Sequence, residues 1–484
     1  MIRGIRKSRK RNLQATPKYF APIILGVILL AACNPAPAPA TAVPPTSLPP
    51  TEAPPPALLH EHSMQLGNSN APTSLAPRRS RDLDDNRIGI DFEGFERYGE
   101  WAEHVYSNGF KLVRIQSLTD FWGDGYGLAF FQLEEIPSEV DDKINEYISN
   151  GVAVRLDLWI GAGLEPHGKA FNNEGEINQY LDYVNFVVSH FKRRISSYQI
   201  WNEPGANTPS EYADIVRRTV PVIREADPEA KILIPGMFGN WDNGIAGYGK
   251  YQRFTLDLVY LFELLGSGIA PIIDGISFHP FYDNIPADPY YQDYPLMLQR
   301  IKDLASSHGF TGEYYADELL WRTVTEEGWA GGPPVSKTIA AKYFTRAITM
   351  HRGLDAYVSI NTFFQEPFLA PIHNLSDTLA GAEPVEISSS VDLEDANLSQ
   401  YAFALPNGDK LIALWINDDA VEEDPGISTS LNVQNLSAYQ VIGIDVFQGL
   451  EQELDFEIED GQLFIHHLLV RDYPIFVKFI GTAP

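Results

Sequence analysis

Eight short apolar runs alternate with amphipathic stretches between residues 82 and 383, and this alternation predicts a parallel (β/α)8 TIM barrel. From residue 384 to residue 484 short apolar runs are separated by turns alone, which predicts an antiparallel β-sandwich. The second interpretation of the first region is an open doubly wound sheet. A nucleotide-binding version of that sheet is disfavoured, because no glycine-rich phosphate loop follows the first strand.

The barrel strands are expected where short apolar runs are bounded by turn residues. They are residues 87–91, 111–116, 153–159, 197–201, 231–236, 275–279, 313–318 and 357–363. Helix signals lie between them, such as apolar residues on one helical face across residues 177–191. Thr208, Pro209 and Glu211 have the spacing of a capping box. The weakest helix signal is the last, at residues 374–380.

The sandwich strands are expected at residues 400–405, 410–417, 428–433, 439–447, 454–458, 463–470 and 475–480. Turn sequences such as Asn407-Gly408-Asp409 and Asp460-Gly461 separate them. The few aromatic residues of this region form no evident sugar-binding strip, so the sandwich is expected to brace the barrel.

Residues 1–32 have the pattern of a secretory signal: a basic start followed by an apolar stretch too short to span a bilayer comfortably. The stretch ends in Leu30-Ala31-Ala32-Cys33, which resembles a bacterial lipobox, and Cys33 is the only cysteine. The resemblance implies a lipid on Cys33 that anchors the chain to the bacterial cell membrane, outside the cytoplasm. The alternative is an ordinary signal peptide or an uncleaved anchor.

Residues 33–81 are rich in Pro, Ala, Thr and Ser, a composition that predicts a disordered tether. The signal carries seven basic and no acidic residues, so its removal takes the net charge from −28 to −35. Such a polyanion repels nucleic acid, whereas a neutral polymer would meet no such barrier. The histidines show no metal-ligand spacing, and neither a metal nor a cofactor is expected.

Two glutamates follow opposite strands of the predicted barrel. Glu203 comes after the fourth strand and Glu318 ends the seventh, so both should lie at the carboxyl-terminal mouth, where barrel enzymes place their sites. Strict alternation would turn Asn202 or Glu203 away, which predicts a bulge or an early strand end. Along the seventh strand, alternation predicts that Glu318 points inward and Asp317 outward.

The stretch Trp201-Asn202-Glu203-Pro204 resembles the strand-four signature of glycoside hydrolase clan A, which includes many cellulases, mannanases and β-xylosidases. The resemblance implies that Glu203 is the acid/base and that Asn202 holds the sugar 2-hydroxyl. A barrel followed by a β-sandwich is common in this clan, and the resemblance covers most of residues 86–484.

Three further positions match the clan. The resemblance implies that Glu318 is the nucleophile, that Arg114 on strand two supports it, and that His279 on strand six lines the sugar pocket. On strand six many members read His-x-Tyr, whereas this chain has Phe281 there and Tyr282 one residue later. Tyr282 is therefore one candidate sugar contact.

Other neighbours also differ from the clan. The residue before the nucleophile is Asp317 rather than Thr or Ser, and strand eight has Phe363 and Phe364 where a tryptophan platform is common. Trp321 is a further candidate sugar contact. Four tryptophans lie near expected strand ends and could stack on sugar rings: Trp122, Trp159, Trp241 and Trp321.

The expected function is that of a retaining glycoside hydrolase, which cleaves O-glycosidic bonds of β-linked oligo- or polysaccharides by double displacement. One alternative is a transglycosylase with the same residues. Another is a non-catalytic carbohydrate-binding lipoprotein, and a third is an adhesion or structural protein. The sugar, the choice between endo and exo action, and the oligomeric state are left open.

Overall fold

The computed structural model describes residues 70–92, 95–116, 118, 136–159, 171, 173–204, 207–235, 259–281, 284–323, 334–361, 369–393 and 396–481. The expected signal segment, Cys33 and most of the expected tether lie outside these ranges. Among the described residues, no helix is both long enough and apolar enough to cross a membrane.

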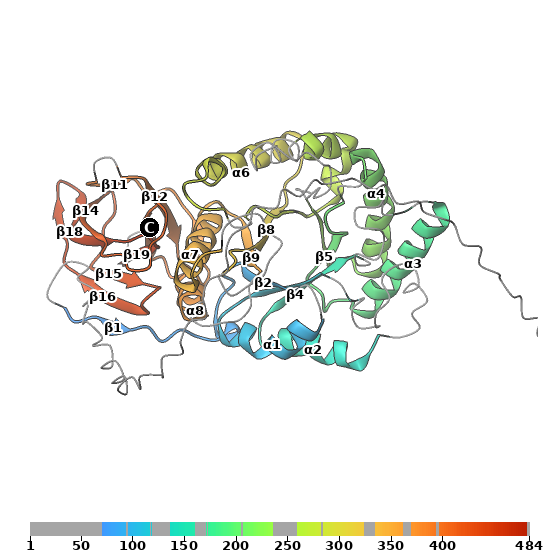
Figure 1. Cartoon of the computed structure of the whole chain (residues 1–484), viewed down its shortest axis with the longest axis horizontal. Helices are drawn as coiled ribbons and strands as arrows, with labels where there is room; N and C mark the ends of the chain where they lie inside the picture. The colour runs from blue at the N-terminus through green and yellow to red at the C-terminus, as the bar shows by residue number, and fades with distance from the viewer. Residues whose placement is uncertain are drawn as a thin grey trace, which may run out of the picture. The chain divides into compact units, whose positions relative to one another are not determined.

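All eight predicted barrel strands are present, and they close into one parallel barrel (Figure 1). They are β2 (Ile88–Phe92), β3 (Leu112–Ile115), β4 (Ala153–Leu158), β5 (Ser197–Ile200), β6 (Lys231–Pro235), β7 (Gly275–Phe278), β8 (Glu313–Leu319) and β9 (Tyr357–Ile360). Each strand pairs in parallel with the next, and β9 returns to β2. The barrel prediction is confirmed, and closure excludes the doubly wound sheet.

Helices of the barrel flank these strands. They are α1 (Phe95–Ser107), α2 (Ser138–Ser149), α3 (Glu174–His190), α4 (Pro209–Ala226), α6 (Pro289–Ser307), α7 (Lys337–Gly353) and α8 (Leu369–Thr378). Short 3-10 or π turns are η1 (Ser80–Asp82), η4 (Leu265–Ile269) and η5 (Ala270–Ile272). The capping box predicted at Thr208 and Glu211 is present at the start of α4. The last helix, α8, begins five residues before the expected 374–380.

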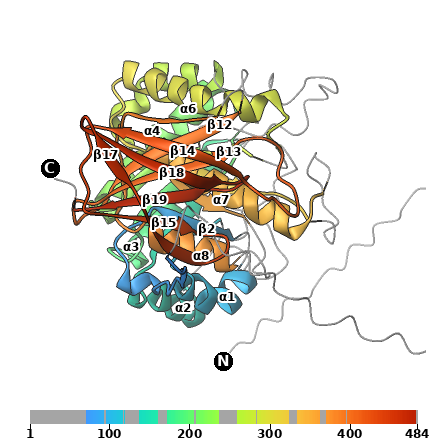
Figure 2. The same ribbon diagram turned by 90° about the vertical axis from the view of Figure 1, so that its left-hand side faces the viewer.

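The carboxyl-terminal region forms two antiparallel sheets, as predicted (Figure 2). One contains, in order, β1 (Thr73–Ser74), β16 (Leu450–Leu454), β15 (Gln440–Asp445), β19 (Ile475–Ile480), β13 (Lys410–Ile416), β12 (Leu398–Ala404) and β10 (Glu383–Pro384). The other contains β11 (Ser389–Val391), β14 (Ile427–Gln434), β18 (Gln462–Val470) and β17 (Glu457–Glu459). Residues 454–458 are not one strand as expected, since the chain passes from β16 to β17 there and changes sheet.

The expected tether ends earlier than residue 81. Thr73 and Ser74 pair with β16, so the backbone there has sheet partners that a Pro- and Ser-rich composition does not reveal. Arg78 then forms an ion pair with Asp377 of α8 (2.8 Å), and Ser80 Oγ donates to the carbonyl of Phe110 (2.6 Å). Residues 73–80 therefore belong to the folded part of the chain.

Helix α7 supplies buried bonds to the sandwich. Lys342 Nζ lies 2.8 Å from Asp472 Oδ1. Arg346 donates to the backbone carbonyls of Asp472 (2.5 Å) and Asp418 (2.7 Å), and the Arg346 side chain has no exposed surface. Because cations buried on the helix need these acceptors, the barrel and the sandwich depend on each other for satisfied polar groups.

Candidate active site

The chain turns sharply at the mouth end of β5. The strand ends at Ile200, and both Trp201 (φ 72°) and Glu203 (φ 43°) take the left-handed conformation. Regular alternation therefore stops, as predicted, and neighbouring side chains reach the same site. Asn202 Oδ1 accepts from Arg114 Nη2 (2.9 Å), and Glu203 Oε1 lies 2.9 Å from His279 Nδ1.

Strand β8 contains a bulge at the second glutamate. Its pairing with β9 shifts register between Ala316 and Leu319, and Glu318 has a φ of 55°. Both Asp317 and Glu318 consequently reach the barrel interior. Asp317 Oδ2 accepts from Arg155 Nη2 (2.5 Å) and is fully buried. The prediction that Asp317 points outward is wrong, because a bulge interrupts the alternation on which it was based.

Three groups on β2, on β3 and directly after β3 hold Glu318. Arg114 Nη1 donates to Glu318 Oε1 (2.7 Å), and Gln116 Nε2 donates to the same oxygen (2.8 Å). The backbone N–H of Glu318 donates to Asp91 Oδ2 (2.6 Å). The contact of Arg114 agrees with its expected place, whereas sequence analysis missed Gln116 and Asp91. Gln116 could have been found, since it lies two residues after Arg114 and so on the same face.

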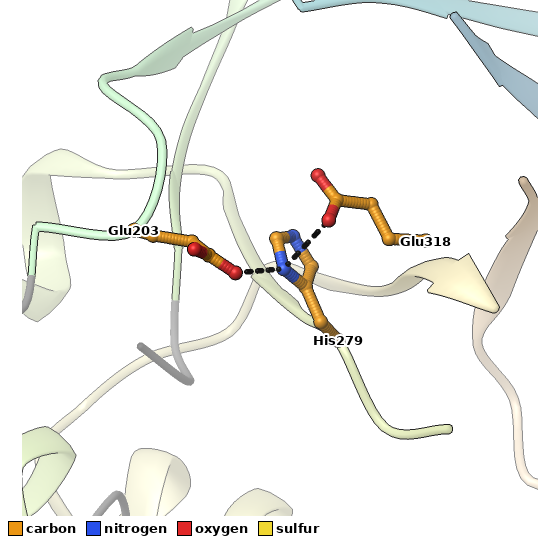
Figure 3. Close-up of side chains that lie close together, drawn as sticks. All are labelled: Glu203, His279 and Glu318. Atoms are coloured by element: carbon orange, nitrogen blue, oxygen red, sulfur yellow. Dashed lines mark hydrogen bonds and ion pairs between the residues drawn. The ribbon is translucent and has the colours of Figure 1, made fainter. Parts of the chain in front are cut away.

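His279 lies between the two glutamates (Figure 3). Its Nδ1 is 2.9 Å from Glu203 Oε1 and 3.2 Å from Glu318 Oε2. One oxygen of each carboxylate and this nitrogen all lie within 4.8 Å of one another. The side chain of Glu203 is 22% exposed and that of Glu318 is 10% exposed, so the pair forms a mostly buried site.

The electrostatic surroundings of His279 favour its charged form. Burial alone would lower the pKa of His279, but the charges of Glu318 and Glu203 raise the pKa above its usual value. The three clustered atoms have a spacing that a metal ion could also bridge. The raised pKa of His279 opposes such binding, because a metal must compete with a proton for the ring nitrogen.

The barrel interior beneath this site is charged rather than apolar. Six side chains lie buried there: Asp91, Arg114, Arg155, Asp157, Asp317 and Glu318. Arg114 also donates to Asp157 Oδ2 from Nε (3.1 Å) and from Nη2 (2.6 Å). Four carboxyl groups thus share two guanidinium groups. Burial raises the pKa of Asp157, against the opposing effect of Arg114, and the carboxylates raise the pKa of Arg114 well above its usual value despite its own burial.

Trp321 is not placed to stack on a sugar. It is 2% exposed, and its Nε1 donates to the carbonyl of Asn284 (2.7 Å). Its ring packs against Phe281 (5.8 Å between centroids) and Phe344 (5.1 Å). Phe281 is also fully buried in this aromatic cluster. The predicted contact between Trp321 and the substrate is therefore wrong, because the indole fills the core between β8 and α7.

Several other expected contacts fall outside the described residues. They are Tyr282, Trp122, Trp241, Phe363 and Phe364. Trp159 is described; it is partly buried and packs against the core of the barrel.

Comparison with known proteins gives the class of the protein. Residues 92–253 match the family model described as cellulase, glycosyl hydrolase family 5. The match begins in β2 and includes Arg114, Asn202 and Glu203, which meet at the site described above. The protein is a glycosidase. It resembles glycoside hydrolases of clan A, as its sequence motif predicted. No curated protein matches the chain.

Several solved structures have the same fold. A family 39 glycoside hydrolase from the gut symbiont Bacteroides cellulosilyticus WH2 is 15% identical, with 83% of this chain and 82% of that chain covered and a TM-score of 0.56. The catalytic domain of GH30 xylanase C from Talaromyces cellulolyticus is 12% identical (85% and 99% covered, TM-score 0.52). A family 5 glycoside hydrolase from Bacteroides vulgatus ATCC 8482 is 11% identical (81% and 88% covered, TM-score 0.51).

Proposed function

We propose that the protein is a retaining glycosidase in which Glu318 is the nucleophile and Glu203 is the acid/base. The observation that carries this proposal is the short separation of the two carboxylates, which bring oxygens within 4.8 Å of one another. Retaining enzymes hold their carboxyl groups about 5–5.5 Å apart, whereas inverting enzymes leave about 6.5–9.5 Å for a water molecule. So close an approach of two carboxylate oxygens favours the retaining mechanism.

The surroundings of the two glutamates support different roles. Glu318 accepts bonds from the guanidinium of Arg114 and the amide of Gln116, and these donors stabilise an ionised carboxylate. Glu203 has no arginine or lysine partner among the ion pairs of the described residues, and it is the more exposed of the two. It is thus the better placed to exchange protons with a leaving group and with water.

The reaction would then proceed in two displacements. Glu318 attacks the anomeric carbon while Glu203 donates its proton to the departing glycosidic oxygen, which leaves a glycosyl ester on Glu318. In the second step Glu203 takes a proton from water, and this water attacks the anomeric carbon and releases Glu318. Arg114 stabilises the charge of Glu318 when the ester breaks, and it is already in place to do so.

Asn202 is proposed to bind the sugar hydroxyl next to the anomeric carbon. Arg114 Nη2 donates to Asn202 Oδ1 and so fixes which end of the amide is the acceptor. The amide nitrogen then serves as the donor to the sugar. The same arginine therefore orients the nucleophile and the substrate-binding amide.

The proposed substrates are β-linked oligo- or polysaccharides. The matching family model is named for cellulase and one structural neighbour is named a xylanase, which makes cellulose and xylan fragments the first polymers to test. A panel of aryl β-glycosides would identify the sugar. Proton NMR of the first product should show the β-anomer before mutarotation; an α-anomer would exclude a retaining reaction.

Azide rescue separates the two glutamate roles. In Glu318→Ala, azide should attack the anomeric carbon directly and give an inverted glycosyl azide. In Glu203→Ala, azide should replace water in the second step and give a retained glycosyl azide, because two inversions then occur. The opposite pattern would exchange the roles.

Two other outcomes would favour the alternative functions. Products elongated by a sugar at high acceptor concentration would favour a transglycosylase. Retention of glycan by the wild type without cleavage would favour a binding protein.

We also propose that Cys33 carries a lipid that anchors the enzyme to the bacterial membrane, outside the cytoplasm. The lipobox-like sequence before Cys33 supports this proposal. Expression in a bacterial host with radiolabelled palmitate should label the wild type and not Cys33→Ser. Equal labelling of both chains would refute it.

A further inference from the structure

We propose that Asp91 is a positioning residue that keeps the carboxylate of Glu318 at the site by accepting a bond from its backbone N–H. The bond joins Glu318 N to Asp91 Oδ2 at 2.6 Å, and both residues are buried. This inference rests on the proposed role of Glu318 as the nucleophile. It assigns a function to a carboxyl group that is neither the proposed nucleophile nor the proposed acid/base.

The backbone of Glu318 requires such a partner. In a regular strand, consecutive side chains point to opposite faces, so a strand that directs Asp317 inward would direct Glu318 outward. Because of the bulge and the φ of 55° at Glu318, the side chains of Asp317 and Glu318 both reach the barrel interior. A left-handed conformation is unfavourable for a glutamate and persists only where surrounding contacts hold it.

Asp91 provides this contact from a strand that does not neighbour β8. β9 pairs with both β8 and β2, and Ile360 of β9 is opposite Leu319 on one side and Ile90 on the other. The N–H of Glu318 falls within the register shift of the β8–β9 pairing. The carboxyl of Asp91 reaches across from β2 and accepts this N–H. The side chain of Asp91 on β2 therefore binds the backbone of the bulge directly.

The charge distribution of the interior indicates that Asp91 does this as a neutral acid. Arg114 lies 2.6 Å from Asp157 and 2.7 Å from Glu318 but 3.9 Å from Asp91. Arg155 lies 2.5 Å from Asp317. Asp157, Glu318 and Asp317 thus form short ion pairs with the two guanidinium groups. The carboxyl of Asp91 has the longest of these distances.

Protonation of Asp91 is consistent with its surroundings. Burial raises the pKa of Asp91 to about 8, with further contributions from the charges of Asp317 and Glu318 and against the effect of Arg114. A neutral Asp91 can accept the N–H of Glu318 without competing with Glu318 for Arg114. Asparagine has the shape of a neutral aspartic acid and an oxygen that can accept the N–H of Glu318, so Asp91→Asn should keep this bond. Alanine and leucine have no acceptor and should lose the bond.

The test compares three substitutions on the full chain. Asp91→Ala and Asp91→Leu should lower kcat about 100-fold, the loss typical of a misplacement near 1 Å, with KM little changed, whereas Asp91→Asn should stay within about fivefold of the wild type. Leucine fills the space that alanine leaves empty. Asp91→Leu can therefore still be assayed if the cavity in Asp91→Ala prevents folding. Asp445→Ala is the matched control, because Asp445 is also a buried carboxyl that accepts backbone N–H groups, from Phe447 (3.1 Å) and Gln448 (2.9 Å).

The control should lower the melting temperature and leave kcat unchanged at a temperature where it is folded. Wild-type kcat in folded Asp91→Leu would overturn the proposal, and so would an Asp91→Asn enzyme as slow as Asp91→Leu. Crystal structures give a second readout that needs no turnover: Glu318 should lose its positive φ in Asp91→Leu and keep it in Asp91→Asn. An unchanged Glu318 in Asp91→Leu overturns the positioning role, whereas a wild type that cleaves no glycoside overturns only the proposed reaction.

Discussion

Replacement of Arg114 by methionine should destabilise the protein in a way that depends on pH. The Arg114 side chain is fully buried and donates to Asp157, Glu318 and Asn202. Methionine retains much of the apolar stem but none of the charge. In Arg114→Met the four buried carboxyl groups would share only Arg155, and Asp157 and Glu318 would lose their shortest cationic contacts.

The magnitude follows from the burial of these groups. Removal of one partner from a buried ion pair costs about 3–5 kcal/mol of unfolding free energy. In the variant the folded state favours the neutral carboxyls, so their folded pKa values rise above the unfolded values of about 3.9 for Asp and about 4.3 for Glu. Above about pH 4 the unfolded chain releases these protons and the folded chain retains them, so stability falls as pH rises. For each carboxyl, a tenfold change in its proton affinity on folding is worth about 1.4 kcal/mol of unfolding free energy.

The assay is urea unfolding of wild type and Arg114→Met at pH 4.5 and pH 7.5, followed by tryptophan fluorescence. Arg346→Met is the matched control, since Arg346 is equally buried but donates to the neutral backbone carbonyls of Asp472 and Asp418. Relative to wild type, Arg114→Met should lose much more stability at pH 7.5 than at pH 4.5, and Arg346→Met should lose the same amount at both. An equal loss for Arg114→Met at the two pH values would refute the reasoning.

Three further predictions concern the active site, and a fourth concerns its surroundings. Glu203→Gln should slow aryl glycosides with poor leaving groups far more than dinitrophenyl glycosides, which need no proton; equal slowing would remove Glu203 as the acid. His279→Asn should move the acid limb of the kcat/KM profile to higher pH, because the raised pKa of His279 keeps a positive charge beside Glu318; an unmoved limb would contradict this. Dialysis against a chelator should leave turnover unchanged, whereas loss that metal restores would assign an ion to the cluster. Trp321→Ala should reduce stability by about 3–5 kcal/mol with little change in KM, and a raised KM at unchanged stability would return Trp321 to the binding surface.

The barrel could be predicted because each of its strands is a short apolar run between turn residues, and the match of 275–279 with β7 (Gly275–Phe278) is typical. Glu203 and Asn202 could be found because a four-residue motif marks the end of one strand. Asp317 was misplaced since a bulge in β8 depends on contacts from β2, which no local pattern contains.

The polar barrel interior was the other feature that could not be predicted. Barrel interiors are usually filled by branched apolar residues. The sequence therefore did not indicate a role for Arg155 and Gln199, which lie within apolar runs. In the structure Arg155 donates to Gln199 and to Asp317, which makes it part of the support beneath the site. Trp321 was misplaced for a related reason: nearness to a strand end along the chain does not say whether a side chain faces the mouth or the helices.

The most direct test of the proposed reaction is to trap its covalent intermediate. A 2-deoxy-2-fluoro aryl β-glycoside of the preferred sugar should form the glycosyl ester rapidly and hydrolyse it slowly. Mass spectrometry of the intact protein and of its peptic peptides should find one added fluorosugar, attached to Glu318 and absent from Glu318→Gln. A stable label on another carboxyl group, or α-anomeric product with no labelled enzyme, would contradict double displacement through Glu318.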